Sequence, residues 1–92
     1  MEYRRLGHSG LQVSVIGLGT NNFGPRLDDA AAERVLRQAV EVGINVIETS
    51  NTYGDGQAEA FIGQALRGHR DQVLLATKVG SNMGEGPNTH GG

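Results

Sequence analysis

Three polar residues follow apolar segments of the sequence and together could perform acid–base chemistry: Glu48, Tyr53 and Lys78. When a hydride is transferred to a carbonyl carbon, negative charge develops on the oxygen, so a proton donor must lie about 3 Å from that oxygen. A tyrosine hydroxyl has an ordinary pKa of about 10, and a nearby lysine ammonium makes it a better donor by stabilising the phenolate. A carboxylate behind the lysine would hold the ammonium in place. These residue types are therefore suited to the reduction of a carbonyl group.

Each of the three residues also has an ordinary structural interpretation. A lysine or a glutamate at the end of a strand is usually a solvated surface charge, and a tyrosine in a loop usually packs on its neighbours. A catalytic interpretation therefore requires a fold that brings the side chains together. Adjacent parallel strands would place Glu48 beside Lys78, and Tyr53 would fold back toward them from the intervening loop.

The first half of the sequence predicts a hairpin, a buried strand and a helix. Residues 7–10, Gly-His-Ser-Gly, are a turn signal between two short segments of mixed polarity, which is typical of a hairpin. The apolar run over 15–19 predicts a buried strand. A helix is predicted to begin at Asp28 or Asp29, which can accept its free amide protons, and to end at Gly43. Its apolar face consists of Ala32, Val35, Leu36, Ala39 and Val40.

The second half of the sequence repeats this pattern. Residues 44–49 are rich in β-branched side chains and predict a second strand, and residues 73–77 predict a third. Between them, a polar loop over 50–56 precedes a helix that Gly68 would end. The apolar face of this helix consists of Ala58, Phe61, Ile62, Ala65 and Leu66.

The predicted order is a hairpin followed by β-α-β-α-β, which indicates an α/β fold with a parallel sheet. The strands are apolar without clear alternation, which predicts that both faces of the sheet are covered. Loops after strands are longer than loops after helices. Ligands of α/β folds bind at the carboxyl ends of the strands, so Thr20, Asn21, the segment 48–53 and Lys78 lie where a ligand is expected.

Composition narrows the class of protein. The chain has 92 residues and a net charge of −2, with both signs interspersed, so it forms one small domain without a basic surface for nucleic acid or membrane. No apolar stretch approaches the roughly 20 residues that span a bilayer, and Met1 precedes charged residues rather than an apolar signal core. We therefore expect a soluble, cytoplasmic protein. The chain has no cysteine, and His8, His69 and His90 are far apart, so we expect no metal site and three surface histidines.

The common nucleotide-binding motifs of α/β proteins do not fit this sequence. Gly17-Leu-Gly19 could open a dinucleotide fingerprint, but Asn22 stands where its third glycine should be. The predicted helix also begins too late for its amide terminus to hold a pyrophosphate at those glycines. A Walker-type phosphate loop is excluded because the chain contains no Gly-Lys pair.

Four segments in register carry a resemblance to a known family. They are Val15-Ile-Gly-Leu-Gly-Thr20, Gly43-Ile-Asn-Val-Ile-Glu-Thr49, Tyr53-Gly-Asp-Gly56 and Ala76-Thr-Lys-Val-Gly80. In these segments the sequence resembles the aldo-keto reductases, near the branch that includes the potassium-channel β subunits and related bacterial reductases. The resemblance implies a TIM (β/α)8 barrel closed at its bottom by an amino-terminal hairpin, of which this chain would supply about three of the eight βα units. It also implies reduction of aldehydes and ketones to alcohols with NADPH, or alternatively NADH, and without a metal.

Carried over by position, the resemblance places the family's catalytic tyrosine on Tyr53 and its lysine on Lys78. The catalytic aspartate falls on Glu48, which departs from the pattern. The extra methylene would move the carboxylate outward by roughly 1.5 Å, whereas catalytic sites tolerate about 0.5 Å. The cofactor-binding positions fall on Gly19, Thr20, Asn21 and Glu48. By the resemblance, Thr20 and Asn21 approach the nicotinamide ribose, and Glu48 contacts it too.

The expected organisation is one partial barrel domain, with a hairpin over 1–14, βαβαβ over 15–79 and a glycine-rich loop over 80–92. By the resemblance, the family's catalytic histidine and the segments that hold the rest of the cofactor would follow residue 92. We therefore expect a fragment that is inactive alone and needs the remainder of the barrel to act on a small carbonyl substrate. The alternative is a non-catalytic module of the same fold that binds a nicotinamide cofactor or has a regulatory role.

Overall fold

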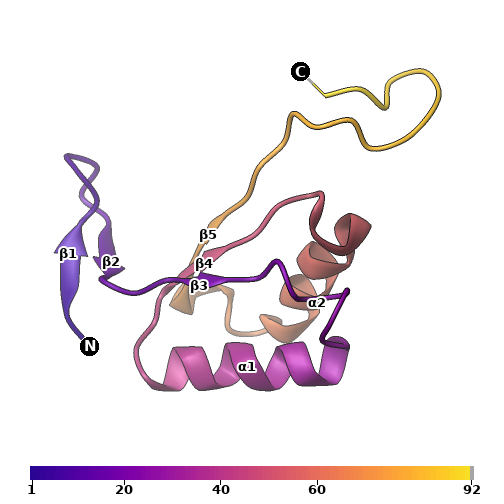
Figure 1. The fold of residues 1–92 in the computed structure, drawn as a ribbon. Helices are drawn as coiled ribbons and strands as arrows, with labels where there is room; N and C mark the ends of the chain where they lie inside the picture. The colour runs from indigo at the N-terminus through magenta and orange to yellow at the C-terminus, as the bar shows by residue number, and fades with distance from the viewer. Residues whose placement is uncertain (92) are drawn as a thin grey trace.

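The structure, a computed structural model, describes residues 1–91 and contains a hairpin, a three-stranded sheet and two α-helices (Figure 1). In chain order the elements are β1 (Tyr3–Arg5), β2 (Gln12–Ser14), β3 (Leu18–Gly19), α1 (Asp29–Glu41), β4 (Val46–Glu48), the 3-10 helix η1 (Tyr53–Gly56), α2 (Gln57–Ala65), the 3-10 helix η2 (Arg70–Gln72) and β5 (Leu74–Ala76). The predicted order of hairpin and β-α-β-α-β is confirmed.

Local signals in the sequence set both ends of α1. Asp28 caps α1, because its Oδ1 accepts a hydrogen bond from the Ala31 backbone N–H at 2.9 Å. Such a cap typically contributes about 1 kcal/mol to stability. Gly43 directly follows the C-cap residue of α1 with a φ of +97°, the left-handed conformation that ends a helix at low cost on glycine. The second helix, α2, ends at Ala65 with Leu66 as its C-cap, before the predicted stop at Gly68.

The sheet has the order β3-β4-β5, and all its strands are parallel. Two rows of residues lie in register across it. The first row is Leu18, Ile47 and Leu75, and the second is Gly19, Glu48 and Ala76. Because successive residues of a strand face opposite sides, the first row faces α1 and α2, and the second row faces away from them.

The core lies between the sheet and the two helices. Ile47, in the central strand, has no exposed surface, and burying such a side chain stabilises the fold by roughly 1.5–3 kcal/mol. The buried apolar residues that cluster around it are Phe23, Ala32, Leu36, Ala58, Ile62, Leu66 and Val73. Both helices lie on this one side (Figure 1). The prediction that both faces are covered is therefore wrong for the described residues. Apolar residues such as Val46 and Leu74 make the second face apolar, but an apolar sequence does not show which element covers that face.

The first predicted strand is shorter and less buried than expected. Only Leu18–Gly19 form β3, whereas Val15 and Ile16 are 46% and 56% exposed. The reason is that the Val15 backbone N–H donates to Glu2 O at 3.0 Å and so continues the hairpin instead of the sheet. The predicted burial of residues 15 and 16 is therefore wrong.

The hairpin is attached at the amino-terminal end of the sheet (Figure 1). The Asn45 side chain, just before β4, accepts from the Ser14 N–H at 2.8 Å and donates to Gln12 O at 2.9 Å. The Asn45 N–H donates to Ser14 Oγ at 3.1 Å, and the Tyr3 hydroxyl donates to Gly43 O at 2.6 Å. The hairpin therefore lies at the end of the sheet opposite to Glu48.

The sequence predicts short connections after helices and longer ones after strands, and the structure follows this only in part. The segment between α2 and β5 runs over residues 66–73 and contains η2, so this connection after a helix is longer than expected. Residues 80–91 form the predicted loop, closed by a hydrogen bond from Met83 N–H to Thr89 O at 2.8 Å, and residue 92 lies outside the described residues. No helix within residues 1–91 is long and apolar enough to cross a bilayer.

Candidate active site

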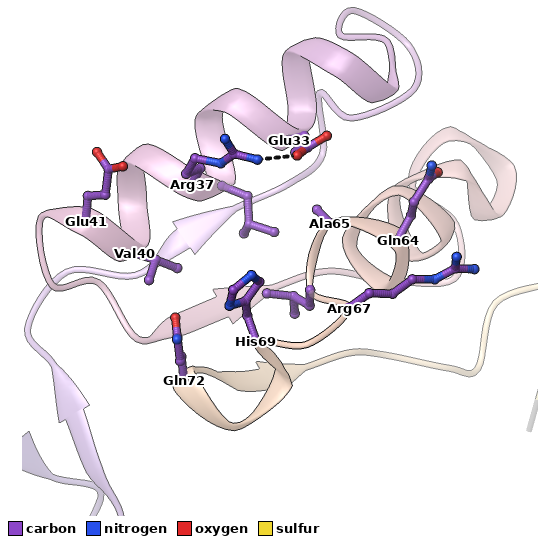
Figure 2. A pocket seen from close by; sticks show the side chains of 11 residues that line it. Glu33, Arg37, Val40, Glu41, Gln64, Ala65, Arg67, His69 and Gln72 are labelled. Carbon is purple, nitrogen blue, oxygen red and sulfur yellow. Dashed lines mark hydrogen bonds and ion pairs between the residues drawn. The ribbon is translucent and has the colours of Figure 1, made fainter.

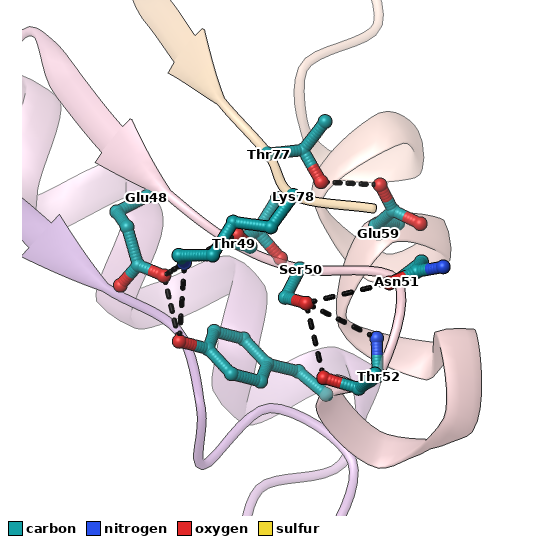
Figure 3. A network of polar contacts seen from close by, with 9 residues as sticks. Glu48, Thr49, Ser50, Asn51, Thr52, Glu59, Thr77 and Lys78 are labelled. Carbon is teal, nitrogen blue, oxygen red and sulfur yellow. Dashed lines mark hydrogen bonds and ion pairs between the residues drawn. The ribbon is translucent and has the colours of Figure 1, made fainter. Parts of the chain in front are cut away.

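Glu48, Tyr53 and Lys78 meet at the carboxyl edge of the sheet. Figure 3 shows the Lys78 side chain pointing toward Glu48. Glu48 ends β4, Tyr53 opens η1, and Lys78 follows β5 by two residues. The Tyr53 hydroxyl donates to Glu48 Oε1 at 2.7 Å, and Lys78 Nζ donates to the same carboxylate oxygen. Lys78 Nζ also lies 3.3 Å from the Tyr53 hydroxyl oxygen. The sequence-based expectation that parallel strands bring these three side chains together is confirmed as a matter of geometry.

The Lys78 ammonium is held by three acceptors. Besides Glu48 Oε1 and the Tyr53 hydroxyl, it donates to the Thr49 carbonyl oxygen at 2.9 Å. An ammonium has three N–H groups, so these contacts use all of them and fix its position. Nζ also lies 5.0 Å from the centroid of the Tyr53 ring, within the range of a cation–π interaction.

The electrostatics of the cluster favour a charged pair. The hydrogen bond from Lys78 holds the pKa of the Glu48 carboxyl below its ordinary value of 4.5, and the hydrogen bond from Tyr53 acts in the same direction. The hydrogen bond to Glu48 raises the pKa of the Lys78 ammonium above its ordinary value of 10.5. At neutral pH, Glu48 is therefore a carboxylate and Lys78 an ammonium.

A compact turn presents Tyr53 to this pair. Buried Ser50 organises the turn, since its Oγ accepts from the Thr52 N–H at 3.3 Å and its carbonyl oxygen accepts from the Tyr53 N–H at 3.2 Å. After Tyr53 the backbone takes left-handed φ values of +59° at Gly54 and +56° at Asp55. These values turn the chain into α2 and leave the tyrosine side chain facing back toward Glu48.

The strand end that carries Lys78 is fastened to α2. The Thr77 hydroxyl donates to Glu59 Oε2 at 2.7 Å, and Glu59 lies in the first turn of α2 (Figure 3). The residue before Lys78 is therefore tied to the helix that follows Tyr53. Two elements that carry candidate residues are in this way connected outside the cluster itself.

The predicted cofactor-binding residues lie at the same edge but are not equally available. A methyl group added at Gly19 would lie 3.2 Å from Glu48 Oε2, so the glycine leaves this carboxylate oxygen open. Asn21 is exposed. Thr20 has no exposed surface, and its Oγ1 has no hydrogen-bond partner among the described residues. A contact between Thr20 and a cofactor therefore stays a prediction.

The sequence analysis placed the segment 48–53 at this edge but missed the roles of Thr49 and Ser50 within it. The Thr49 carbonyl holds Lys78, but a backbone acceptor has no signature in the sequence. Ser50 carries a weak signal, since a serine that opens a polar segment is typical of a turn stabilised by its hydroxyl. The three histidines, predicted at the surface, lie outside this cluster.

A groove of about 390 Å³ lies between α1 and α2 (Figure 2), and Glu48, Tyr53 and Lys78 are not among the residues that line it. Leu36 and Val40 of α1 and Ala65 of α2 contribute apolar lining. The Glu33–Arg37 ion pair beside the groove has a length of 2.5 Å, but both side chains are largely exposed and contribute little to stability. The residues that line the groove include no tyrosine and no lysine, so the groove lacks the tyrosine–lysine pair that distinguishes the carboxyl edge.

Comparisons with known proteins agree on one family. Residues 15–92 match the aldo/keto reductase family. The aldo-keto reductase YhdN of Bacillus subtilis strain 168 is 40% identical over 85 residues, which cover 86% of this chain and 26% of that protein. The uncharacterized oxidoreductase YqkF of the same organism is 36% identical over 86 residues, which cover 94% of this chain and 28% of that protein.

The solved structures give the same result. The aldo-keto reductase AKR11C1 from Bacillus halodurans, in its holo form, matches with a TM-score of 0.84 and 39% identity. That match covers 98% of this chain and 30% of the solved chain. The chain therefore spans less than a third of the length of the relatives it matches. The partial-barrel fold inferred from the sequence is confirmed by this similarity.

Proposed function

This chain belongs to the aldo/keto reductase family, and we propose that it carries the proton-donating part of the active site of an NAD(P)H-dependent carbonyl reductase. One observation carries the proposal: a tyrosine, a carboxylate and a lysine form a single hydrogen-bonded cluster at the carboxyl edge of the parallel sheet. In α/β barrels this edge is where catalytic residues lie.

Tyr53 is proposed to donate its hydroxyl proton to the oxygen of an aldehyde or ketone. As the proton leaves, negative charge develops on the Tyr53 oxygen, and Lys78 Nζ at 3.3 Å is placed to stabilise it. Glu48 and the Thr49 carbonyl hold the ammonium, so it need not reorganise during the transfer. Positioned proton donors of this kind contribute a factor of about 10²–10⁴ to the rate.

Glu48 also accepts a hydrogen bond from the Tyr53 hydroxyl, and the substrate oxygen must replace Glu48 as the acceptor of this bond. The tyrosine hydroxyl has one proton, and it is directed at Glu48 Oε1. Before Tyr53 can protonate a carbonyl oxygen, its O–H bond must turn away from the carboxylate. The substrate oxygen and Glu48 therefore compete for the same proton.

The carboxyl edge also fits the nicotinamide end of the proposed cofactor. Glu48 Oε2 receives no hydrogen bond from the described residues, and Gly19 leaves it uncovered. A ribose hydroxyl could donate to Oε2, and the exposed amide of Asn21 offers both a donor and an acceptor nearby in the loop after β3. A nicotinamide cofactor bound here would supply the hydride to the carbonyl carbon, and the proton from Tyr53 would complete the alcohol.

The test uses a chimera in which this chain precedes the matching remainder of the Bacillus halodurans aldo-keto reductase, since the chain spans 30% of that protein. We expect Tyr53→Phe to lower turnover of small aldehydes at least about a hundredfold and to leave NADPH affinity nearly unchanged. Tyr3→Phe is the matched control, because it removes a hydroxyl that contacts only the hairpin side of the sheet, at Gly43 O.

Two outcomes would contradict the proposal in different ways. Unchanged turnover in Tyr53→Phe would remove Tyr53 from the mechanism. A chimera that binds NADPH but reduces no aldehyde would favour the non-catalytic cofactor-binding module instead.

A further inference from the structure

Two glycines form a close contact between the loop after β3 and the turn that holds Tyr53. Gly24 lies in that loop, and Gly54 directly follows Tyr53. A methyl group added at Gly54 would lie 2.9 Å from the Phe23 carbonyl oxygen and 3.2 Å from Pro25 Cδ. Real Cβ atoms essentially never approach another heavy atom closer than 3.0 Å, so something would have to move.

The contact is equally close from the other side. A methyl group added at Gly24 would lie 2.8 Å from Gln57 Oε1, 3.0 Å from Gln57 Cβ and 3.3 Å from Gly54 Cα. Both glycines also have positive φ values, +103° at Gly24 and +59° at Gly54. The two backbones therefore touch without any intervening side chain.

The loop has little freedom to yield to such a clash. Phe23 is 3% exposed and belongs to the core cluster. Its N–H donates to Thr20 O at 2.9 Å, the Gly24 N–H donates to Leu27 O at 2.8 Å, and the Leu27 N–H donates to Asn22 O at 3.0 Å. A clash between a methyl group at Gly54 and the loop would therefore displace the turn that carries Tyr53 and not the loop.

We propose that Gly24 and Gly54 form a steric interlock that sets the position of the Tyr53 hydroxyl; this inference rests on the proposed function of Tyr53. The hydroxyl contacts Glu48 at 2.7 Å and Lys78 at 3.3 Å. Catalytic geometry is held within about 0.5 Å, so a small displacement of the turn would break this arrangement. The two glycines are positioning residues, since they act only through Tyr53.

The experiment compares alanine substitutions in the chimera. We expect Gly54→Ala to lower kcat at least about tenfold, toward the hundredfold loss associated with a misplacement of about 1 Å, with NADPH affinity nearly unchanged. Gly24→Ala should lower kcat less, because the end of the Gln57 side chain can swing away from the added methyl group.

Two other glycines separate the steric effect from backbone strain. Gly7 has a φ of +55°, which is close to that of Gly54, and Gly56 has a φ of +100° within the same turn. A methyl group added at either position would meet no atom within 4 Å. Gly7→Ala and Gly56→Ala should therefore leave kcat within about twofold.

Two further readouts identify Tyr53 as the residue through which the interlock acts. In a Tyr53→Phe background, Gly54→Ala should cause no further loss of kcat. In isotope-labelled protein, the nuclear Overhauser effect between the Tyr53 ring and the Lys78 side chain should weaken in Gly54→Ala and persist in Gly56→Ala. Gly24→Ala provides the same comparison if Gly54→Ala does not fold.

The inference would be overturned if Gly54→Ala and Gly56→Ala lowered kcat equally, or if Gly54→Ala caused the same loss in the Tyr53→Phe background as in the unsubstituted chimera. An unchanged Tyr53–Lys78 contact in both interlock variants would also overturn it. Failure of the proposed function looks different: the unsubstituted chimera would show no turnover, while the contact would still weaken in Gly54→Ala.

Discussion

The Tyr53 hydroxyl donates to the same Glu48 oxygen that receives a hydrogen bond from Lys78. An aspartate at position 48 would place its carboxylate roughly 1.5 Å, one carbon–carbon bond, closer to the strand. The longer glutamate does not lose contact with Lys78, which was the concern raised by the sequence. It gains a contact to the proposed proton donor instead.

We predict that Glu48→Asp raises the turnover of the chimera severalfold. The shorter side chain withdraws from the Tyr53 hydroxyl, so the substrate no longer competes with a carboxylate for its proton, while a negative charge remains beside Lys78. Steady-state rates on a panel of small aldehydes would measure the change. Glu33→Asp is a suitable control, because this carboxylate pairs with Arg37 on α1 and lies outside the cluster. A clear fall in turnover would mean that the site depends on glutamate.

The Glu48–Lys78 pair should stabilise the fold over a defined pH range. The folded-state pKa of Glu48 is lowered, so its contribution is present above about pH 4.5 and is lost as the pH falls through that lowered value. The folded-state pKa of Lys78 is raised, so its contribution is present below about pH 10.5 and is lost as the pH rises through that raised value. Between these limits the contribution should be flat.

A double-mutant cycle with Glu48→Gln and Lys78→Met, followed by urea unfolding of the chimera, would measure this coupling. The effect should be small and should weaken with added salt, because the side chains are 38% and 55% exposed. A coupling that is equally large at neutral pH and well below the folded-state pKa of Glu48 would show that charge does not hold the two residues together.

The 92 residues expressed alone should associate and should neither reduce carbonyls nor bind NADPH at micromolar concentration. In the described chain, β3 and β5 each pair only with β4, so each leaves one edge open. Open edges with apolar neighbours favour pairing between chains. A domain of this size is also marginally stable even with a complete core.

Size-exclusion chromatography, amide exchange and a fluorescence titration with NADPH would test this expectation, with the chimera as the positive control for binding. We expect amide protection to be greatest around Ile47, the most buried part of the sheet. A monomer with protected strands that binds NADPH would instead identify a self-sufficient small domain.

The sequence predicted those features that depend on local signals or on the geometry of parallel strands. The α1 boundaries follow from Asp28 and Gly43, whose effects on the backbone are local. The meeting of Glu48 and Lys78 follows because both lie at the carboxyl ends of neighbouring strands. These features require no knowledge of how side chains pack.

The features that were not predicted depend on neighbours in space. Ile16 is as apolar as Ile47, yet one is exposed and the other fully buried, because only the central strand lies beneath both helices. Thr20 is polar but wholly buried. The Gly24–Gly54 contact joins two loops, and the sequence of neither loop indicates that it packs against the other.

The attachment of the hairpin through Asn45 has a dynamic consequence. The amide side chain of Asn45 accepts a hydrogen bond from the Ser14 N–H and donates one to the Gln12 carbonyl oxygen. It therefore replaces the backbone groups that a neighbouring strand would offer to the hairpin. The hairpin and the parallel sheet are therefore separate units of local unfolding, which can open with different free energies. The contacts that join them, through Asn45 and between Tyr3 and Gly43, lie at the end of the sheet away from Tyr53. Fluctuations that detach the hairpin can therefore occur without disturbing the Glu48–Tyr53–Lys78 cluster.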